Sequence, residues 1–430
     1  MVIVENEKEW SQFLEEFKTK DSFIVPIACD DNKHPIDTNL CLLYISIMPD
    51  FEEYILPFKH SDTENLDVSR LKELITEQDL YCLDKKKLLH FVDLPNLKDM
   101  QMITYLEKNE TIVIQDTITN AHEHFHRIYW GGSNLNCVIP ILKHLEACRT
   151  ITMSVRESVF YNTKPFFDRY NMDVLENLQQ IESVGLQTTD GMVYSEYNPY
   201  TATGRPSNRF GGLNFAALNK KDGSREKFIS RFGDKGMLVE MDYDAYHLRL
   251  IGDIVGYSFS KGSVHEHMAK LYGVDYEEAK SLSFQYLYGH IPEEVLNSNP
   301  FFMRVQKYID KNWARWEKDK FIISDIYSKK IYSKNLPDMN ANKLFNYSIQ
   351  LMETENNMRM LRELLPKIKE YKSKLVLYNY DSFLFDFHID DGIDFLRLAK
   401  RTIESDSKFP VKVSKGWNYH QMEDITEKFV

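Results

Sequence analysis

Residues 239–250 read VEMDYDAYHLRL, and they say more about the fold of this chain than any other stretch. An apolar run ends near Asp242 and a helical pattern follows, so this aspartate is expected at the end of a strand. There its carboxylate would be a good ligand for a hard cation, although an aspartate in this place also caps helices. Residues 375–386, LVLYNYDSFLFD, put Asp381 at a turn between two apolar strands, where aspartate is also favoured for its own hydrogen bonds.

A third stretch, EEAKSLSFQYLYG at residues 277–289, is predicted to be a helix that Asp275 caps. Lys280, Phe284 and Tyr288 recur every four residues, so they share one face of that helix. A lysine between aromatic side chains suits a triphosphate, with a base or sugar stacked beside it. A lysine whose aliphatic stem lies along buried aromatic rings would give the same pattern.

The three stretches together indicate one reaction. Two carboxylates that meet in space can clamp a pair of divalent ions, and a lysine can neutralise a triphosphate. In-line nucleotidyl transfer requires both.

The composition is that of an ordinary folded protein, with 43% hydrophobic and 27% charged residues. At 430 residues the chain is too long for one compact core, so two or three domains are expected. No apolar run reaches the roughly 20 residues of a membrane span, and the acidic N-terminus does not resemble a secretion signal. We therefore expect a cytoplasmic protein without membrane association, in the host cytoplasm if a phage encodes it.

All five cysteines lie within the first 150 residues of the sequence, and none forms a CxxC pair. Reduced thiols are therefore expected, and a zinc site is not. The net charge of -12 argues mildly against nucleic-acid binding. Residues 219–235 and 304–320 are locally basic, however, and would suit either a DNA-binding groove or a solvated helix face.

The chain divides by pattern into three parts. Residues 1–150 are predicted to be mixed α/β, with strands in FIVPIACDD (23–31), NLCLLYISI (39–47), EYILPF (53–58) and TIVIQD (111–116) and helices in VSRLKELITE (68–77) and VIPILKHLEACR (138–149). Residues 151–200 are predicted to be a short, mostly helical connector, and NPYTATGRPSNRFGG (198–212) a loop. Residues 201–430 are expected to open with a strand, close with two hairpin strands, and be helical between.

Taken in chain order, these elements resemble the family A DNA polymerases, the bacterial DNA polymerase I and phage replicative type. TATGRPSN resembles the TxTGRxSS loop, DYDAYHLR resembles motif A (DYSQIELR), and AKSLSFQYLYG resembles motif B (RxxxKxxNFGxxYG). SVHEHMAKLYG resembles the DIHxxTA stretch, NYSIQ the NxxxQ segment, and YDS resembles motif C (HDE). The resemblance covers residues 200–390. It implies an α+β multidomain protein whose right-hand polymerase part has an antiparallel palm sheet, helical fingers at about residues 251–340 and a thumb reduced to the connector.

The resemblance also assigns roles to individual residues. Asp242 and Asp381, with the backbone carbonyl of Tyr243, would hold two Mg²⁺ ions, for which Mn²⁺ is a possible substitute. Lys280 would contact the triphosphate of the incoming deoxynucleotide and take part in catalysis with the two aspartates. The other positions implied in nucleotide binding are Phe284, Tyr288, His247 and Tyr276. Those implied in binding primer-template DNA are Arg205, Asn214, Asn346 and Gln350.

Several positions depart from the family pattern. Tyr276 replaces the motif B arginine, so one phosphate contact is missing. His247 replaces the motif A glutamate that excludes ribose. Motif C carries Tyr380 and Ser382 in place of histidine and glutamate. The connector is also short for a thumb, so grip on the duplex is expected to depend on a processivity or replisome protein.

The first 150 residues resemble the ribonuclease H-like 3′–5′ exonuclease domain that precedes such polymerases. The resemblance rests on residues 39–62, which follow its second and third strands. The metal-binding carboxylates of that domain would fall on Ile27, Cys29 and a position near Leu88. Asp30 and Asp31 lie close by but out of register. The implied domain is therefore a proofreading fold without proofreading activity.

The leading hypothesis is thus a compact, exonuclease-deficient, template-directed DNA polymerase. The alternative from another class is a polymerase-fold protein that binds DNA or the replisome with weak or no catalysis, suggested by the altered motif B and the small thumb. A third possibility is a nuclease that uses Asp30 and Asp31.

Overall fold

The computed structural model describes residues 1–114, 135–159, 170, 172–210, 213–214, 218, 222–259, 262–324, 326–405 and 408–429. The chain forms two compact units, Met1–Gln179 and Gln180–Val430. The division falls inside the predicted connector 151–200. The expected three-part division of the chain remains a prediction.

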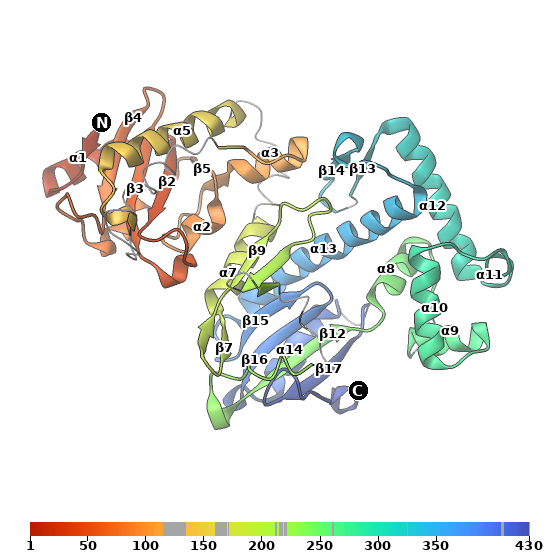
Figure 1. Ribbon diagram of the computed structural model, residues 1–430. Coiled ribbons are helices and arrows are strands. Elements are labelled where there is room, and N and C mark those ends of the chain that lie inside the picture. Colours follow the sequence, from red (N-terminus) through yellow and green to blue (C-terminus); the bar gives the residue numbers. More distant parts are fainter. Residues whose placement is uncertain are drawn as a thin grey trace. The chain divides into compact units, whose positions relative to one another are not determined.

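The first unit is built on a six-stranded mixed sheet in the order β1-β4-β3-β2-β5-β6 (Figure 1). Its strands are β1 (Val2–Ile3), β2 (Ser22–Ala28), β3 (Leu40–Ile47), β4 (Glu52–Pro57), β5 (Leu80–Cys82) and β6 (Leu97–Asp99). β3 pairs antiparallel with both β2 and β4, while the pairs β1–β4, β2–β5 and β5–β6 are parallel. Only β3 therefore runs against the other five strands.

Alternating side chains of this sheet enter two separate cores. Ile24 of β2 packs with Trp10 of α1, whereas its neighbour Val25 packs with Ile141 and Leu145 of α5. Both faces of the sheet are therefore covered, which explains why these strands are almost continuously apolar. The helices of this unit are α1 (Glu7–Phe17), α2 (Lys85–Leu89), α3 (Met100–Lys108) and α5 (Ile141–Val159).

The second unit contains a five-stranded antiparallel sheet in the order β15-β16-β12-β17-β18. Its strands are β12 (Gly236–Tyr243), β15 (Lys374–Asn379), β16 (Ser382–His388), β17 (Val411–Gly416) and β18 (Glu423–Asp424). The remaining strands form β7 (Leu186–Thr188) with β8 (Gly191–Val193), β9 (Ser195–Asn198) with β10 (Ser207–Phe210) and β11 (Leu213–Asn214), and β13 (Phe321–Ile323) with β14 (Lys330–Tyr332).

A group of helices lies to one side of this sheet (Figure 1). α8 to α10, α12 and α13 share one apolar core, in which Leu248 packs with Val264, Leu287, Phe301 and Phe345. The helices of the unit, together with α7 at its start, are α7 (Asn177–Val184), α8 (Tyr246–Ile254), α9 (Val264–Tyr272), α10 (Tyr276–Tyr288), α11 (Glu293–Ser298), α12 (Pro300–Asp319), α13 (Ala341–Ile368) and α14 (Gly392–Ile403).

Some sequence expectations for local structure were wrong. The stretch predicted as a helix at 68–77 is a 3₁₀ segment, Val68–Leu74, because Asp67 caps its start and extended backbone follows Leu74. Residues 111–114, expected to be a strand, have no regular structure, and the rest of that stretch lies outside the described residues. Ser207–Phe210, expected to be loop, is strand β10, because it pairs with β9.

In the part of the chain that the structure describes, no helix combines the length and apolar character that crossing a bilayer requires.

Candidate active site

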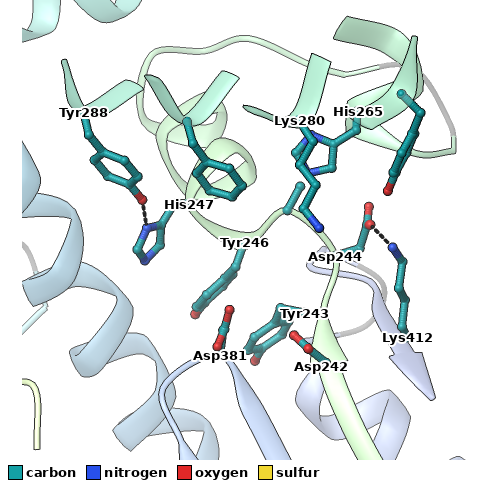
Figure 2. A pocket seen from close by; sticks show the side chains of 13 residues that line it. Asp242, Tyr243, Asp244, Tyr246, His247, His265, Lys280, Tyr288, Asp381 and Lys412 are labelled. Atoms are coloured by element: carbon teal, nitrogen blue, oxygen red, sulfur yellow. Dashed lines mark hydrogen bonds and ion pairs between the residues drawn. The ribbon is translucent and has the colours of Figure 1, made fainter. Parts of the chain in front are cut away.

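A cavity of about 320 Å³ lies in the second unit, beside the ends of β12 and β16 (Figure 2). Eight of the residues that the sequence singled out line this single cavity: Asp242, Tyr243, His247, Tyr276, Lys280, Phe284, Tyr288 and Asp381. The other residues in its wall are Asp244, Ala245, Tyr246, His265 and Lys412. The convergence of the eight predicted residues from separate elements is a property of the fold.

Asp242 lies in β12, and Asp381 lies in the turn that leads into the neighbouring strand β16. β12 pairs with β16 so that Asp242 lies opposite Ser382, and the backbone N–H of Tyr243 donates to the carbonyl of Asp381 at 3.0 Å. Tyr380 has a left-handed backbone, with φ 61°, at the tight turn that places Asp381 beside β12. Figure 2 shows both carboxylates on the same side of the cavity.

Asp242 does not cap the helix that follows it. The N-cap of α8 is Ala245, whose left-handed backbone (φ 51°) turns the chain sharply from the strand into the helix. This turn leaves Asp242 at the strand end and brings His247 to the same cavity. The helix-cap interpretation of Asp242 is therefore wrong.

Asp381 lies in an electrostatically unfavourable place for a carboxylate. Burial, and then the nearby Glu353 carboxylate, raise the pKa of Asp381, while His247 and Arg205 act in the opposite direction. The residue is nonetheless exposed to solvent, because its side chain opens onto the cavity. A cation in the cavity would relieve this repulsion.

One face of α10 lines the cavity from the side opposite the aspartates (Figure 2). Asp275 caps this helix as predicted, accepting a hydrogen bond from the backbone N–H of Glu278 at 2.9 Å. The rings of Phe284 and Tyr288 stack with centroids 6.1 Å apart and planes 10° apart. The other face, with Ala279, Ser283 and Leu287, is buried. The face that carries Lys280 therefore borders the cavity and not the core.

Glu353 of α13 is a buried carboxylate that links residues on two sides. Only 1% of its side chain is exposed. Its Oε2 lies 3.0 Å from Arg205 Nε, and its Oε1 lies 3.2 Å from His247 Nε2. The other ring nitrogen of His247, Nδ1, hydrogen bonds to the Tyr288 hydroxyl. A chain of contacts therefore joins Arg205 through Glu353 and His247 to Tyr288.

Three of the predicted DNA-binding residues, Arg205, Asn346 and Gln350, lie beside the cavity and do not line it. The Arg205 guanidinium stacks 3.7 Å from the centre of the Tyr380 ring. Gln350 accepts a hydrogen bond from Thr203 at 3.4 Å and donates one to Asn346 at 3.1 Å. Arg205, Asn346 and Gln350 thus gather along α13. The remaining predicted DNA-binding residue lies in β11 (Leu213–Asn214), and its side chain is outside the described residues.

A cationic cluster borders the cavity on the side of Tyr276. Asp244 pairs with Lys412 at 3.2 Å and with Arg249 at 2.9 Å. Although burial acts in the opposite direction, these two cations lower the pKa of Asp244, and Asp244 in turn raises the pKa of Lys412. The His265 ring meets the Tyr276 ring edge-on with centroids 5.7 Å apart. Burial is the main reason that the pKa of His265 is lowered.

Glu353 and Lys412 were not among the site residues predicted from the sequence. Glu353 follows Asn346 and Gln350 at helical spacing on the same face of α13, which was a usable signal. Lys412 lies in β17, about 130 residues after Lys280 in the sequence, and only the pairing of β17 with β12 brings it to the cavity. Sequence spacing could not have found it.

No protein-family model matches the chain, and no curated protein matches it. Among solved structures, it is similar to the POL domain of Pol1 from M. smegmatis, determined in complex with DNA primer-template and dNTP. The TM-score is 0.71 at 13% sequence identity, and the match covers 97% of this chain and 99% of that chain. The second unit and the first are therefore both parts of a mixed α/β fold that resembles a DNA polymerase domain over nearly its whole length.

Proposed function

We propose that this chain is a template-directed DNA polymerase that adds deoxynucleotides to a primer 3′-hydroxyl. The observation that carries the proposal is the meeting of Asp242, Asp381 and Lys280 at one cavity, from a strand, a turn and a helix far apart in sequence. The fold similarity to a polymerase domain supports it.

The donor groups at the strand ends fit divalent magnesium. Two carboxylates and a backbone carbonyl are hard oxygen ligands, and Asp381 lies where added positive charge would be favourable. Asp242, Asp381 and the carbonyl of Tyr243 would hold two such ions. When bound, the ions would activate the primer hydroxyl and stabilise the charge on the triphosphate and leaving pyrophosphate.

The cavity wall opposite the aspartates would receive the incoming nucleotide. Lys280 would neutralise the triphosphate and would donate a proton to the leaving pyrophosphate. Phe284 would contact the sugar, and Tyr288 would stack near the templating base. Lys412 lies beside Tyr276, the position that lacks the motif B arginine, and would supply a phosphate contact there.

The primer-template duplex would be bound beside this cavity. Arg205 and Gln350 would contact the minor groove near the primer terminus, with Asn346 next to them. The pair of Arg205 with Glu353 would hold the guanidinium in place before DNA arrives. The side of the catalytic cavity nearest α13 would therefore be the side of the primer end.

The first unit would be a ribonuclease H-like exonuclease domain that does not proofread. The strand order and the single reversed strand β3 support this fold. Two of the expected carboxylate positions hold Ile27 and Cys29, which cannot bind magnesium as carboxylates do. The nearby Asp31 pairs with Lys87 at 2.9 Å and accepts a hydrogen bond from Asn136 at 2.7 Å.

Primer extension with magnesium tests the proposal. A labelled primer on a template of known sequence is incubated with deoxynucleotides and the wild type, Asp242→Asn or Asp253→Asn. Asp253 is a matched control, because it lies on α8 and pairs with Lys408 outside the cavity. Template-dictated extension by the wild type and Asp253→Asn, but not by Asp242→Asn, would support polymerase activity.

The other outcomes discriminate between the alternatives. DNA binding without extension by any of the three proteins would support a non-catalytic, polymerase-fold DNA-binding or replisome protein. Shortening of the primer 3′ end without nucleotides, surviving in Asp242→Asn, would point to a nuclease in the first unit.

A further inference from the structure

Three cysteine side chains converge in the first unit. Cys29 directly follows β2, Cys41 lies in β3, and Cys137 lies in the 3₁₀ segment Leu135–Cys137. Their three sulfur atoms all lie within 4.8 Å of one another. Cys29 and Cys41 are fully buried, whereas Cys137 is partly exposed. The sequence spacing gave no sign of this cluster, because its members lie far apart in the chain.

Backbone hydrogen bonds fix the positions of all three cysteines. The N–H of Cys29 donates to Asn39 at 2.8 Å, and its carbonyl accepts from Asn136 at 3.2 Å. The carbonyl of Cys41 accepts from Phe58 at 2.9 Å, and that of Cys137 accepts from Ser61 at 2.9 Å. The three thiols are therefore held together by the folded backbone.

We propose that Cys29, Cys41 and Cys137 form a binding site for one zinc ion. Thiolates are soft ligands, and zinc is among the metals that select them. Sulfur atoms bonded to zinc at about 2.3 Å in a tetrahedral site lie roughly 3.8 Å apart, so the observed cluster needs little closure. Among the described residues, no histidine or carboxylate joins the three thiols. In this proposal water would supply the fourth zinc ligand, reached through the exposed side of Cys137.

The site has a structural consequence. Zinc would tie β2 and β3 to the 3₁₀ segment before α5, across one core of the first unit. Zinc binding would raise the thermal stability of the chain by mass action. This inference does not depend on the proposed polymerase activity, because its residues and its measurements lie outside the cavity of the second unit.

The competing explanation is that the three thiols only fill the core as small apolar groups. Cys148 is a matched control, because it is also buried and lies in the same apolar cluster but is not one of the three. Burial raises the pKa of the Cys148 thiol, as expected for a thiol that only packs.

The experiment measures metal uptake by the full-length chain kept reduced. The wild type, Cys137→Ser, Cys29→Ser and Cys148→Ser are titrated with ZnCl₂ against a chromophoric competitor, and with CdCl₂ while the thiolate charge-transfer absorption is followed. We expect one ion per wild-type or Cys148→Ser chain, and at least tenfold weaker binding by the other two variants. Zinc should raise the melting temperature of the wild type but not that of Cys137→Ser.

Two results would overturn the proposal. One is a wild type that takes up no zinc and shows no cadmium–thiolate band. The other is loss of binding in Cys148→Ser to the same extent as in Cys137→Ser. Cys137→Ser is the decisive variant, because the Cys137 side chain is only partly buried in the wild type. Circular dichroism can confirm that the variant folds.

Discussion

Replacing Glu353 with glutamine tests whether this buried carboxylate holds the two sides of the site together. The change keeps the size of the side chain but removes its charge. Glu353 Oε2 lies 3.0 Å from Arg205 Nε. Two opposite unit charges at this distance attract each other by about 5 kcal/mol at an effective dielectric constant of about 20. Arg205 keeps 27% of its side chain exposed, so water and the new amide recover part of this energy.

We therefore expect Glu353→Gln to lower the free energy of unfolding by about 2–3 kcal/mol. This lies below the roughly 3–5 kcal/mol lost when one partner of a fully buried ion pair is removed. Urea denaturation measures the loss as a lower midpoint at an unchanged slope. Glu355→Gln is the matched control. Glu355 lies on the same helix, burial raises its pKa to about 7, and it is separate from the cavity.

The kinetic effect distinguishes a positioning residue from a merely structural one. Glu353 raises the pKa of Asp381, so its removal should shift the acidic limb of the pH profile of kcat/KM to lower pH. Loss of its contact with His247 should loosen Tyr288 and reduce kcat/KM for the nucleotide by about 2- to 10-fold. Glu355→Gln should leave both quantities unchanged. A Glu353→Gln enzyme with wild-type stability and an unshifted pH profile would refute the reasoning.

Two further substitutions test the cavity. Lys412→Ala should raise KM for the incoming deoxynucleotide about tenfold with a smaller change in kcat, because a half-exposed phosphate contact is worth roughly 1.4 kcal/mol. Steady-state primer extension measures both constants. Lys415→Ala is the control and should behave as wild type, because Lys415 pairs with Glu423. Asp381→Asn should reduce extension roughly a thousandfold through loss of several kcal/mol of metal-dependent stabilisation. The same variant should be more stable than wild type at pH 7. The pKa of Asp381 is raised in the folded state, so the free energy of unfolding of the wild type falls as the pH rises through that pKa. Asparagine does not titrate, so the variant does not lose this stability. Urea denaturation at pH 7 and pH 5 checks the sign, and an advantage that grows at the lower pH would contradict it.

Much of the local structure, and the set of residues that line the cavity, could be predicted from the sequence. The apolar runs around Asp242 and Asp381 form the expected strands, and the spacing of Lys280, Phe284 and Tyr288 gave the helical face that borders the cavity. These features follow from the two-residue period of strands and the 3.6-residue period of helices, which are local properties. The same patterns could not decide whether Asp242 was a helix cap.

Only the tertiary structure decided which side chains meet. Strand pairing brought Lys412 to the cavity, and packing of α13 placed the Glu353 carboxylate between Arg205 and His247. The three thiols of Cys29, Cys41 and Cys137 converge for the same reason. Contacts between residues far apart in a chain depend on sheet order and helix packing, and neither is encoded in any short window of sequence. Short stretches of the sequence therefore indicated which residues would line the cavity, but not the long-range contacts of Glu353 and Lys412 that accompany them.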